Sequence, residues 1–234
     1  MVEPRIRGFL TERITERLRR AIMDGELQLG QLLSEDKLAL SLGVSRSPVR
    51  KAFAALEQQG LIVVRPQRGS FVFWPTARDI DDLAQFRRLI EVEMLHLAFR
   101  EKRRVTLASM GDAADAMRKA LDVGDTLAAA RADMAYHDAM IENCENSYLL
   151  DAYRMVAGKV AALRSHRAVS PTQERASAEH FQIIAMLEQG DLAGASDLLG
   201  EHILKMADRF KEEWPVGPRP GRGPVLEGIG PLED

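Results

Sequence analysis

The sequence predicts a mainly α-helical protein, in which an N-terminal winged helix-turn-helix of three helices and a small β wing precedes an all-α bundle of six helices. Three observations lead to this fold class. Apolar residues recur at helical spacing along most of the 234 residues, two short β-like runs lie near residue 70, and Pro75 interrupts the pattern where they end. A chain of this length can bury one or two ordinary cores.

The first part of the chain reads as three helices separated by turns. We expect these helices over Phe9–Asp24, Ser34–Leu42 and Ser45 to about Gln59. Ser34 and Ser45 are typical residues before a helix, because a serine hydroxyl can accept a hydrogen bond from a free backbone N–H of the first turn. Gly43 lies between the second and third helices and permits a tight turn. The pattern is helix, turn, helix.

A β-hairpin is expected after the third helix. The runs Leu61–Val64 and Ser70–Phe73 flank the turn Arg65–Gly69, and together they would form the wing. Proline biases the residue before it away from helix, so Pro75 indicates a boundary. We therefore assign residues 1–74 to the winged helix-turn-helix and residues 75–78 to a linker.

Helical periodicity dominates the rest of the chain. The expected helices cover Ile80–Lys102, Thr106–Val123, Thr126–Asn143, Ser147–Ser165, Thr172–Gln189 and Leu192–Trp214. Gly190 and Asp191 end one helix and cap the next, which predicts an antiparallel pair. We assign residues 79–214 to this all-helical domain. Repeated proline and glycine make residues 215–234 a disordered tail.

Charge is divided unevenly between the two parts. The net charge is −3, but residues 1–76 hold 12 Lys/Arg against 8 Asp/Glu, and the remaining residues hold 20 against 27. Only the first part therefore suits a polyanion. No apolar run reaches the length of a membrane span, and the charged start lacks an apolar signal core. We expect a cytoplasmic protein with no membrane partner, and the single Cys144 agrees weakly with a reducing compartment.

The second helix of the helix-turn-helix carries groups suited to DNA. Arg46 and Arg50 lie four residues apart on one side of it, where guanidinium groups can pair with guanine or clamp phosphate. At the wing, a glycine lets the backbone approach DNA closely. The candidate DNA-contacting residues are Ser45, Arg46, Ser47, Arg50, Lys51, Arg68 and Gly69. The alternative is that the arginines are ordinary solvated residues and the winged fold serves protein contacts.

A candidate metal site lies in the helical part. Asp133 and His137 are four residues apart on one expected helix, so a carboxylate and an imidazole can reach one ion. His180 and His202 lie on the last two helices, on either side of their shared turn. One carboxylate and three imidazoles suit zinc first, with nickel, manganese or iron as alternatives, and leave coordination positions open. Taken alone, the same histidines could equally be structural residues satisfied by hydrogen bonds.

The N-terminal motif resembles the GntR family of regulators. The resemblance is carried by Val44-Ser45-Arg46-Ser47-Pro48-Val49-Arg50, Leu56-Glu57, Gly60-Leu61 and Arg68-Gly69, and it covers nearly all of residues 9–73. It implies a winged-helix reader of a double-stranded DNA operator. Lys51 and Phe53 stand where the family often has glutamate and leucine. Asp36 stands where some members have a DNA-contacting arginine, which puts the operator sequence in doubt.

Residues 79–209 resemble the FCD ligand-binding domain of the FadR subfamily, in its shorter, VanR-like branch. The match rests on Asp133-x-x-x-His137, Glu179-His180, Gly190-Asp191 and His202-Ile203. The resemblance implies that Asp133, His137, His180 and His202 are metal ligands. It also implies that Arg87 faces an effector cavity and pairs with a ligand carboxylate, with Asn146 and Arg164 as weaker effector-binding candidates.

These expectations combine into a homodimeric DNA-binding repressor, not an enzyme. Its operator affinity would change when a small carboxylate effector binds at the metal. One alternative is a metal sensor without an organic effector. A second is a metal-dependent enzyme, since an open position on the ion could activate water, but no acid or base is placed clearly beside the ligands.

Overall fold

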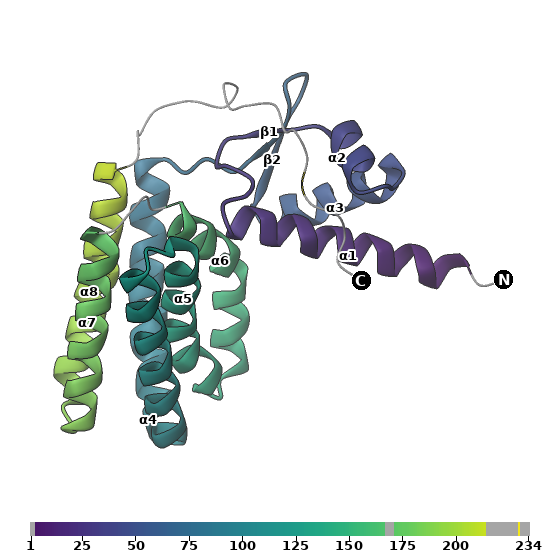
Figure 1. Cartoon of the computed structure of the whole chain (residues 1–234). Helices are drawn as coiled ribbons and strands as arrows, with labels where there is room; N and C mark the ends of the chain where they lie inside the picture. The colour runs from purple at the N-terminus through teal and green to yellow at the C-terminus, as the bar shows by residue number, and fades with distance from the viewer. Residues whose placement is uncertain (1–2, 167–170, 214–228, 230–234) are drawn as a thin grey trace. The chain divides into compact units, whose positions relative to one another are not determined.

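The computed structural model of the protein describes residues 3–166, 171–213 and 229 (Figure 1). Among these residues the chain forms two compact units. The first unit holds residues 3–74, 158–166 and 229, and the second holds residues 75–157 and 171–213. The expected disordered tail, residues 215–234, lies outside the described part of the chain except for Ile229.

Three helices form the body of the first unit. They are α1 (Glu3–Met23), α2 (Glu35–Ser41) and α3 (Arg46–Gln58). The apolar positions that predicted α1 and α3 face each other, and the buried residues include Ile14, Leu18, Ile22, Val49 and Leu56. α1 begins at Glu3, earlier than the Phe9 expected from apolar periodicity.

The turn between α2 and α3 has the expected geometry. Gly43 has a φ of 65°, a left-handed conformation that glycine adopts without steric cost. The Ser34 hydroxyl accepts a hydrogen bond from the Lys37 backbone N–H, as predicted for a helix cap. Ser45 occupies the corresponding position before α3, but its side chain makes no capping hydrogen bond, contrary to the prediction. Its hydroxyl is exposed instead.

The wing is a three-stranded antiparallel sheet in the order β1-β3-β2. β2 (Ile62–Arg65) and β3 (Gly69–Val72) form the predicted hairpin. β1 (Leu32–Leu33) pairs with β3 and was not predicted, because two residues are too few to show alternation. The hairpin is therefore anchored on its inner side to the segment before α2.

The second unit begins with α4 (Ala77–Asp122), which the sequence presented as two helices separated near residue 104. The structure has one element with a kink at Lys102, where φ is −139°. Residues 100–105 are exposed, so apolar periodicity lapses there, although no proline or glycine ends the helix. The expected linker is also shorter, because Thr76 already caps α4.

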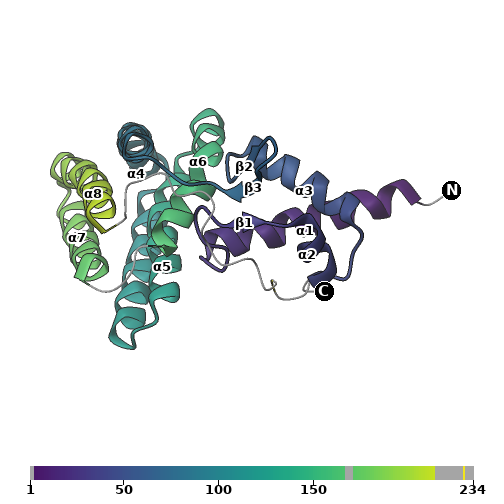
Figure 2. The ribbon, with the colours of Figure 1, turned by 90° about the horizontal axis from the view of Figure 1, so that it is seen from above.

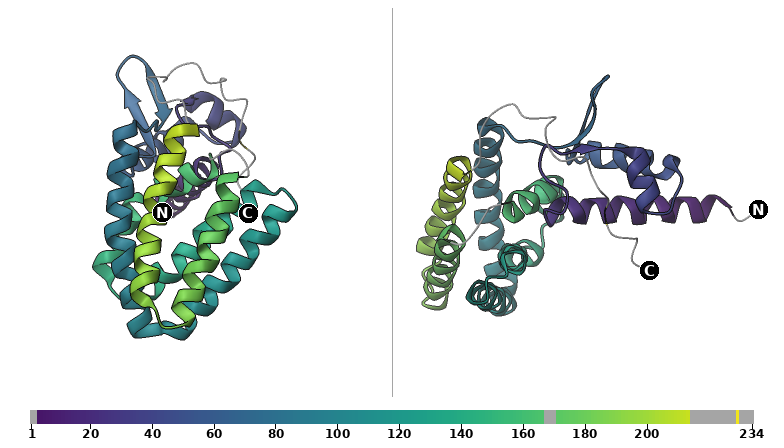
Figure 3. Two further views of the ribbon diagram at one scale, coloured as in Figure 1. Left: turned by 90° about the vertical axis from the view of Figure 1, so that its left-hand side faces the viewer. Right: turned by 45° about the horizontal axis from the view of Figure 1, so that its top comes forward.

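The remaining helices are α5 (Thr126–Asn143), α6 (Ser147–Ser165), α7 (Pro171–Glu188) and α8 (Leu192–Glu213). α7 and α8 lie side by side and are joined by a short turn, which gives the expected antiparallel pair (Figures 2 and 3). α4 packs against α5 and α8. The core between these helices includes Met94, Met110, Tyr136, Ile183 and Leu199. Within the described residues, no helix has the length and apolar character of a membrane span.

Candidate metal centre and nucleic-acid interface

The exposed side of α3 carries the predicted DNA-contacting residues. Ser45, Arg46, Ser47, Arg50 and Lys51 are all exposed at its N-terminal half. The opposite side of α3 is buried through apolar residues in the core of the first unit. The helix therefore presents a polar, cationic face of the kind that enters a DNA major groove.

Two acidic side chains of α2 pair with the arginines of this face. Arg46 Nε lies 2.9 Å from Asp36 Oδ1, and Arg50 Nη2 lies 3.0 Å from Glu35 Oε2. The hydrogen bond to Glu35 raises the pKa of Arg50 above its ordinary value. Exposed ion pairs of this kind contribute little stability, so phosphate or guanine can replace the carboxylates as partners.

The tip of the wing carries the other two predicted DNA contacts. Arg68 and Gly69 are both exposed, and the Arg68 backbone N–H closes the turn on the Arg65 carbonyl at 3.0 Å. Gly69 has a φ of 109°, and a Cβ at this position would lie 2.9 Å from Leu32 Cδ1. A side chain at residue 69 would therefore clash with β1 as well as strain the backbone.

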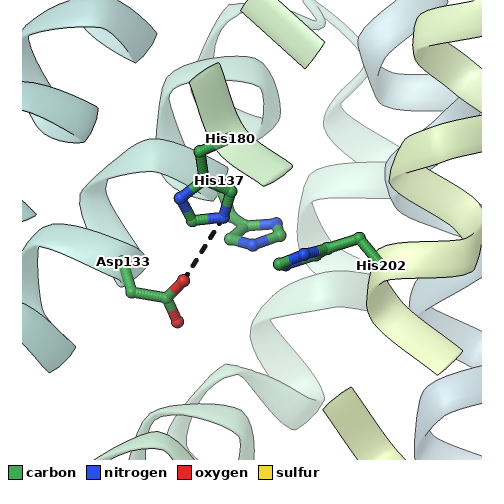
Figure 4. A group of neighbouring side chains, drawn as sticks. All are labelled: Asp133, His137, His180 and His202. Carbon is green, nitrogen blue, oxygen red and sulfur yellow. Dashed lines mark ion pairs between the residues drawn. The ribbon is translucent and has the colours of Figure 1, made fainter. Parts of the chain in front are cut away.

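The four predicted metal ligands come together in the second unit. Asp133 and His137 lie on α5, His180 on α7 and His202 on α8, and all four are buried. One ligand atom from each lies within 4.8 Å of the others. Figure 4 shows the four side chains directed toward one another, with His180 Nε2 3.4 Å from Asp133 Oδ1. Three helices thus place three imidazoles and a carboxylate around one point.

Two glutamates outside the predicted set hold two of these histidines. His137 Nδ1 lies 2.6 Å from Glu91 Oε2, and His202 Nδ1 lies 2.7 Å from Glu179 Oε2. Engagement of Nδ1 in both rings leaves Nε2 as the nitrogen for an ion. Burial is the largest single influence on Glu179 and raises its pKa, but the contacts with His202 and Arg209 together lower the pKa overall.

Arg87 is connected to the metal cluster through Glu91. Its Nε and Nη2 donate to the two carboxylate oxygens of Glu91, at 2.6 and 3.2 Å. The Glu91 side chain is fully buried and that of Arg87 is 11% exposed. Burial is the largest single influence on Arg87 and lowers its pKa, but the charge and hydrogen bond of Glu91 together with the nearby Tyr153 and Asp133 raise the pKa overall. Nη1 takes no part in these two hydrogen bonds, and it lies on the outer edge of the guanidinium.

Tyr136 packs against His180 of the cluster. Its ring stacks on His180, with ring centroids 3.7 Å apart and an interplanar angle of 13°. Its hydroxyl donates to the His180 carbonyl oxygen at 3.4 Å. Burial raises the pKa of Tyr136 well above its ordinary value, so the hydroxyl stays neutral. The residue fixes the plane of the His180 ring.

The two weaker effector candidates are placed differently. The Asn146 side-chain oxygen accepts a hydrogen bond from the Leu149 backbone N–H, at the start of α6. Arg164 is buried near the end of α6, in residues that group with the first unit. Among the contacts that the structure gives in the described residues, none joins Asn146 to the four ligands. Roles for both residues in effector binding stay predictions.

The two glutamates were missed because neither has a ligand-like spacing of its own in the sequence. Glu91 could have been found from its i, i+4 relation to Arg87, which indicates a helix ion pair. Glu179 is next to His180 in the sequence, but in the structure it pairs with His202 on the next helix. That partner depends on how α7 and α8 pack.

Both parts of the chain match described families. Residues 10–72 match "Bacterial regulatory proteins, gntR family", and residues 82–205 match "FCD domain". A D-xylose utilization operon transcriptional repressor of Paenarthrobacter nicotinovorans is 28% identical over 182 residues, which are 78% of this chain and 80% of that protein. The transcriptional repressor RspR of Escherichia coli is 44% identical over 63 residues, which are 27% of this chain and 28% of RspR.

A solved structure has the same fold. The crystal structure of a GntR transcriptional regulator from Rhodococcus sp. RHA1 has a TM-score of 0.75 and 26% sequence identity. The similarity covers 88% of this chain and 99% of the Rhodococcus chain, so it extends over both units.

Proposed function

Because the chain belongs to the GntR family of bacterial regulatory proteins and carries an FCD domain, we propose that it is a transcription repressor controlled by a small organic acid. The acid would bind at a divalent metal ion in the helical domain and change the affinity for an operator. Like the proteins it resembles, the chain is a transcription regulator and not an enzyme.

The proposed DNA interface consists of the exposed face of α3 and the tip of the wing. Arg46 and Arg50 would contact base edges or phosphates in the major groove, and Arg68 would reach the adjacent minor groove. Two chains in a homodimer would present two such faces to a roughly two-fold operator in the cytoplasm. The repressor names of the relatives support repression as the outcome.

The convergence of four buried ligand atoms within 4.8 Å is the observation that supports the metal site most strongly. Three imidazoles and one carboxylate suit zinc first, with nickel, manganese or iron as alternatives. The donor set fits a divalent ion because its ligands come from three different helices and leave coordination positions open for a further ligand.

The charges around the cluster favour an acidic effector. The cluster and the groups that contact it include three carboxylates, those of Asp133, Glu91 and Glu179. They also include two guanidinium groups, that of Arg87, which pairs with Glu91, and that of Arg209, which lies 3.5 Å from Glu179. With neutral imidazoles these groups carry one net negative charge, and a divalent ion would make it positive. An organic acid could then place one oxygen on the ion and pair with the outer edge of Arg87.

Operator selection followed by affinity measurement tests this function. Full-length protein would select sites from a random double-stranded DNA library. Dissociation constants for the selected site would then be measured with zinc, with chelator, and with zinc plus a panel of small carboxylic acids. We expect a site with two-fold symmetry whose affinity falls when one acid is added in the presence of metal.

Other results would lead to different conclusions. Affinity that depends on metal but on no acid would select a metal sensor without an organic effector. Affinity that depends on neither would show that the helical domain does not control DNA binding through this site. Failure to select any DNA would overturn the assignment of the α3 face and the wing as the DNA interface.

A further inference from the structure

Glu91 links the candidate metal ligand His137 to the candidate effector residue Arg87. We propose that Glu91 is a positioning residue for the metal site: it orients His137 so that Nε2 faces the ion, and Arg87 holds it in place. This inference rests on the metal site proposed above. It assigns a function to a buried glutamate that offers no ligand atom to the cluster.

The contact between Glu91 and His137 fixes which nitrogen carries the proton. A carboxylate only accepts, so a hydrogen bond of 2.6 Å to Nδ1 requires that Nδ1 carry a hydrogen. In the neutral imidazole the lone pair then lies on Nε2. Both side chains are fully buried, so water does not compete for this hydrogen bond. Glu91 therefore sets both the tautomer and the direction of the ring.

Arg87 completes the arrangement from the other side of the carboxylate. Its two donors span both oxygens of Glu91, which restricts rotation of the carboxylate group. The pair also spans one helical turn of α4, so its geometry follows from the helix itself. An unpaired buried carboxylate would be costly, and the guanidinium supplies the partner of opposite charge.

A second and more exposed chain of contacts reaches the cluster through α7 and α8. Arg209 Nη2 lies 3.5 Å from Glu179 Oε1, and Glu179 Oε2 lies 2.7 Å from His202 Nδ1. The Glu179 side chain is 15% exposed, whereas Glu91 is 0% exposed. The Arg209 contact is also longer than the contacts of Arg87. We therefore expect Glu91 to have the larger effect on metal affinity.

Two variants separate the effect of His137 orientation on metal affinity from the effect of net charge near the ion. The double variant Arg87→Met, Glu91→Met removes one positive and one negative charge, so the net charge near the ion is unchanged while His137 loses its acceptor. Replacement of a buried ion pair by apolar residues of similar volume is often neutral for stability. Glu93→Gln removes a carboxylate from the same helix, but Glu93 is 57% exposed and makes no contact with the four ligands in the described structure.

The first readout is the affinity for zinc alone, measured by competition with a chromogenic chelator at fixed pH. We expect the double variant and Glu91→Gln to bind zinc about 10- to 100-fold more weakly than the unmodified protein. Glu93→Gln should stay within about twofold, because an exposed charge is screened. The absorption bands of the cobalt-loaded protein should change in the double variant and not in Glu93→Gln.

The second readout needs no metal. Nitrogen NMR of the chelator-treated protein should show His137 as the Nδ1–H tautomer, and this signature should be lost in the double variant. If the double variant does not fold, Glu91→Gln and the tautomer of the unmodified protein still test the inference.

The outcomes distinguish this inference from the proposed function. If the unmodified protein binds no metal, the metal site itself fails. If it binds metal and the folded double variant binds zinc equally well with unchanged cobalt bands, Glu91 is a structural residue and the inference is wrong. An equal loss in Glu93→Gln would show that charge alone matters, which also overturns it.

Discussion

At the scale of single residues, the arginines of the α3 face already have partners before DNA arrives. Asp36 and Glu35 pair with Arg46 and Arg50 across the turn of the helix-turn-helix. DNA binding must replace these carboxylates by phosphates or base edges. The acidic groups also bring negative charge close to the phosphates. We therefore expect these pairs to reduce operator affinity.

Asp36→Asn should strengthen operator binding. Removal of the carboxylate leaves Arg46 only its longer contact of 3.7 Å with Glu35 and reduces repulsion with the phosphates. We expect up to about a fivefold gain at low salt, since an exposed pair is worth up to about 1 kcal/mol. The gain should fade as salt rises. Glu57→Gln, which makes the same charge change near the other end of α3, is the control. Weaker binding by Asp36→Asn would mean that Asp36 itself contacts DNA.

The sequence was sufficient to predict which four side chains cluster, but not the partners that hold them. Asp133 and His137 share one helix, so their proximity follows from helical geometry. His180 and His202 were placed on either side of the predicted turn between the last two helices, the resemblance implied that they are ligands, and the structure brings both to the same point. The contacts of Glu91 with His137 and of Glu179 with His202 join different helices. Such contacts depend on helix packing, which residue spacing does not encode.

At the scale of elements, the residues before α4 and α3 should respond differently to substitution by alanine. Thr76 and Asp79 form a reciprocal capping box at the start of α4, with hydrogen bonds of 3.1 and 2.8 Å. Thr76→Ala should cost about 1 kcal/mol of stability. This corresponds to a fall of roughly 2–4 °C in Tm for a protein of this size, measured by calorimetry.

Ser45→Ala is the matched control, because Ser45 precedes α3 without a capping hydrogen bond from its side chain. Its Tm should be unchanged, whereas its operator affinity should fall because an exposed hydroxyl at the DNA face is lost. A loss of stability in Ser45→Ala equal to that of Thr76→Ala would contradict this assignment.

The wing depends on glycine at residue 69. Gly69→Ala should destabilise the sheet by about 1–3 kcal/mol, because the left-handed backbone is strained by a side chain. The added Cβ would also press on Leu32 of β1. Thermal unfolding would show the loss. Arg68→Ala should weaken operator binding with no change in Tm. If instead Gly69→Ala left Tm unchanged and Arg68→Ala lowered Tm without weakening binding, our account of the wing would be wrong.

Element boundaries were predicted best where apolar periodicity was continuous. α5 and α6 match their predicted ranges, Thr126–Asn143 and Ser147–Ser165. β1 was missed because it is two residues long, and its pairing with β3 is a contact distant in sequence. The kink at Lys102 was taken for a break because exposed residues interrupt the pattern without ending the backbone helix.

At the scale of the whole molecule, the N-terminal DNA-binding part of the chain is cationic and the helical part that follows it is acidic. The change of charge near residue 76 lies close to the boundary between the two units after residue 74, although residues 158–166 also belong to the first unit. Metal and acid can change operator affinity only to the extent that they bind one arrangement of the two units better than another. A ligand that binds both arrangements equally would stabilise the protein without releasing DNA.

The measurement that tests the account most directly is metal content combined with thermal stability. Unmodified protein would be compared with His137→Ala, His180→Ala and with His96→Ala, which removes an exposed histidine of the same unit. We predict one divalent ion per chain and stabilisation by a small carboxylic acid, about 2.7 kcal/mol when the acid is at 100 times its Kd. Both should be lost in the double variant and kept in His96→Ala. Unmodified protein that takes up no zinc, nickel, manganese or iron would contradict the metal-centred account.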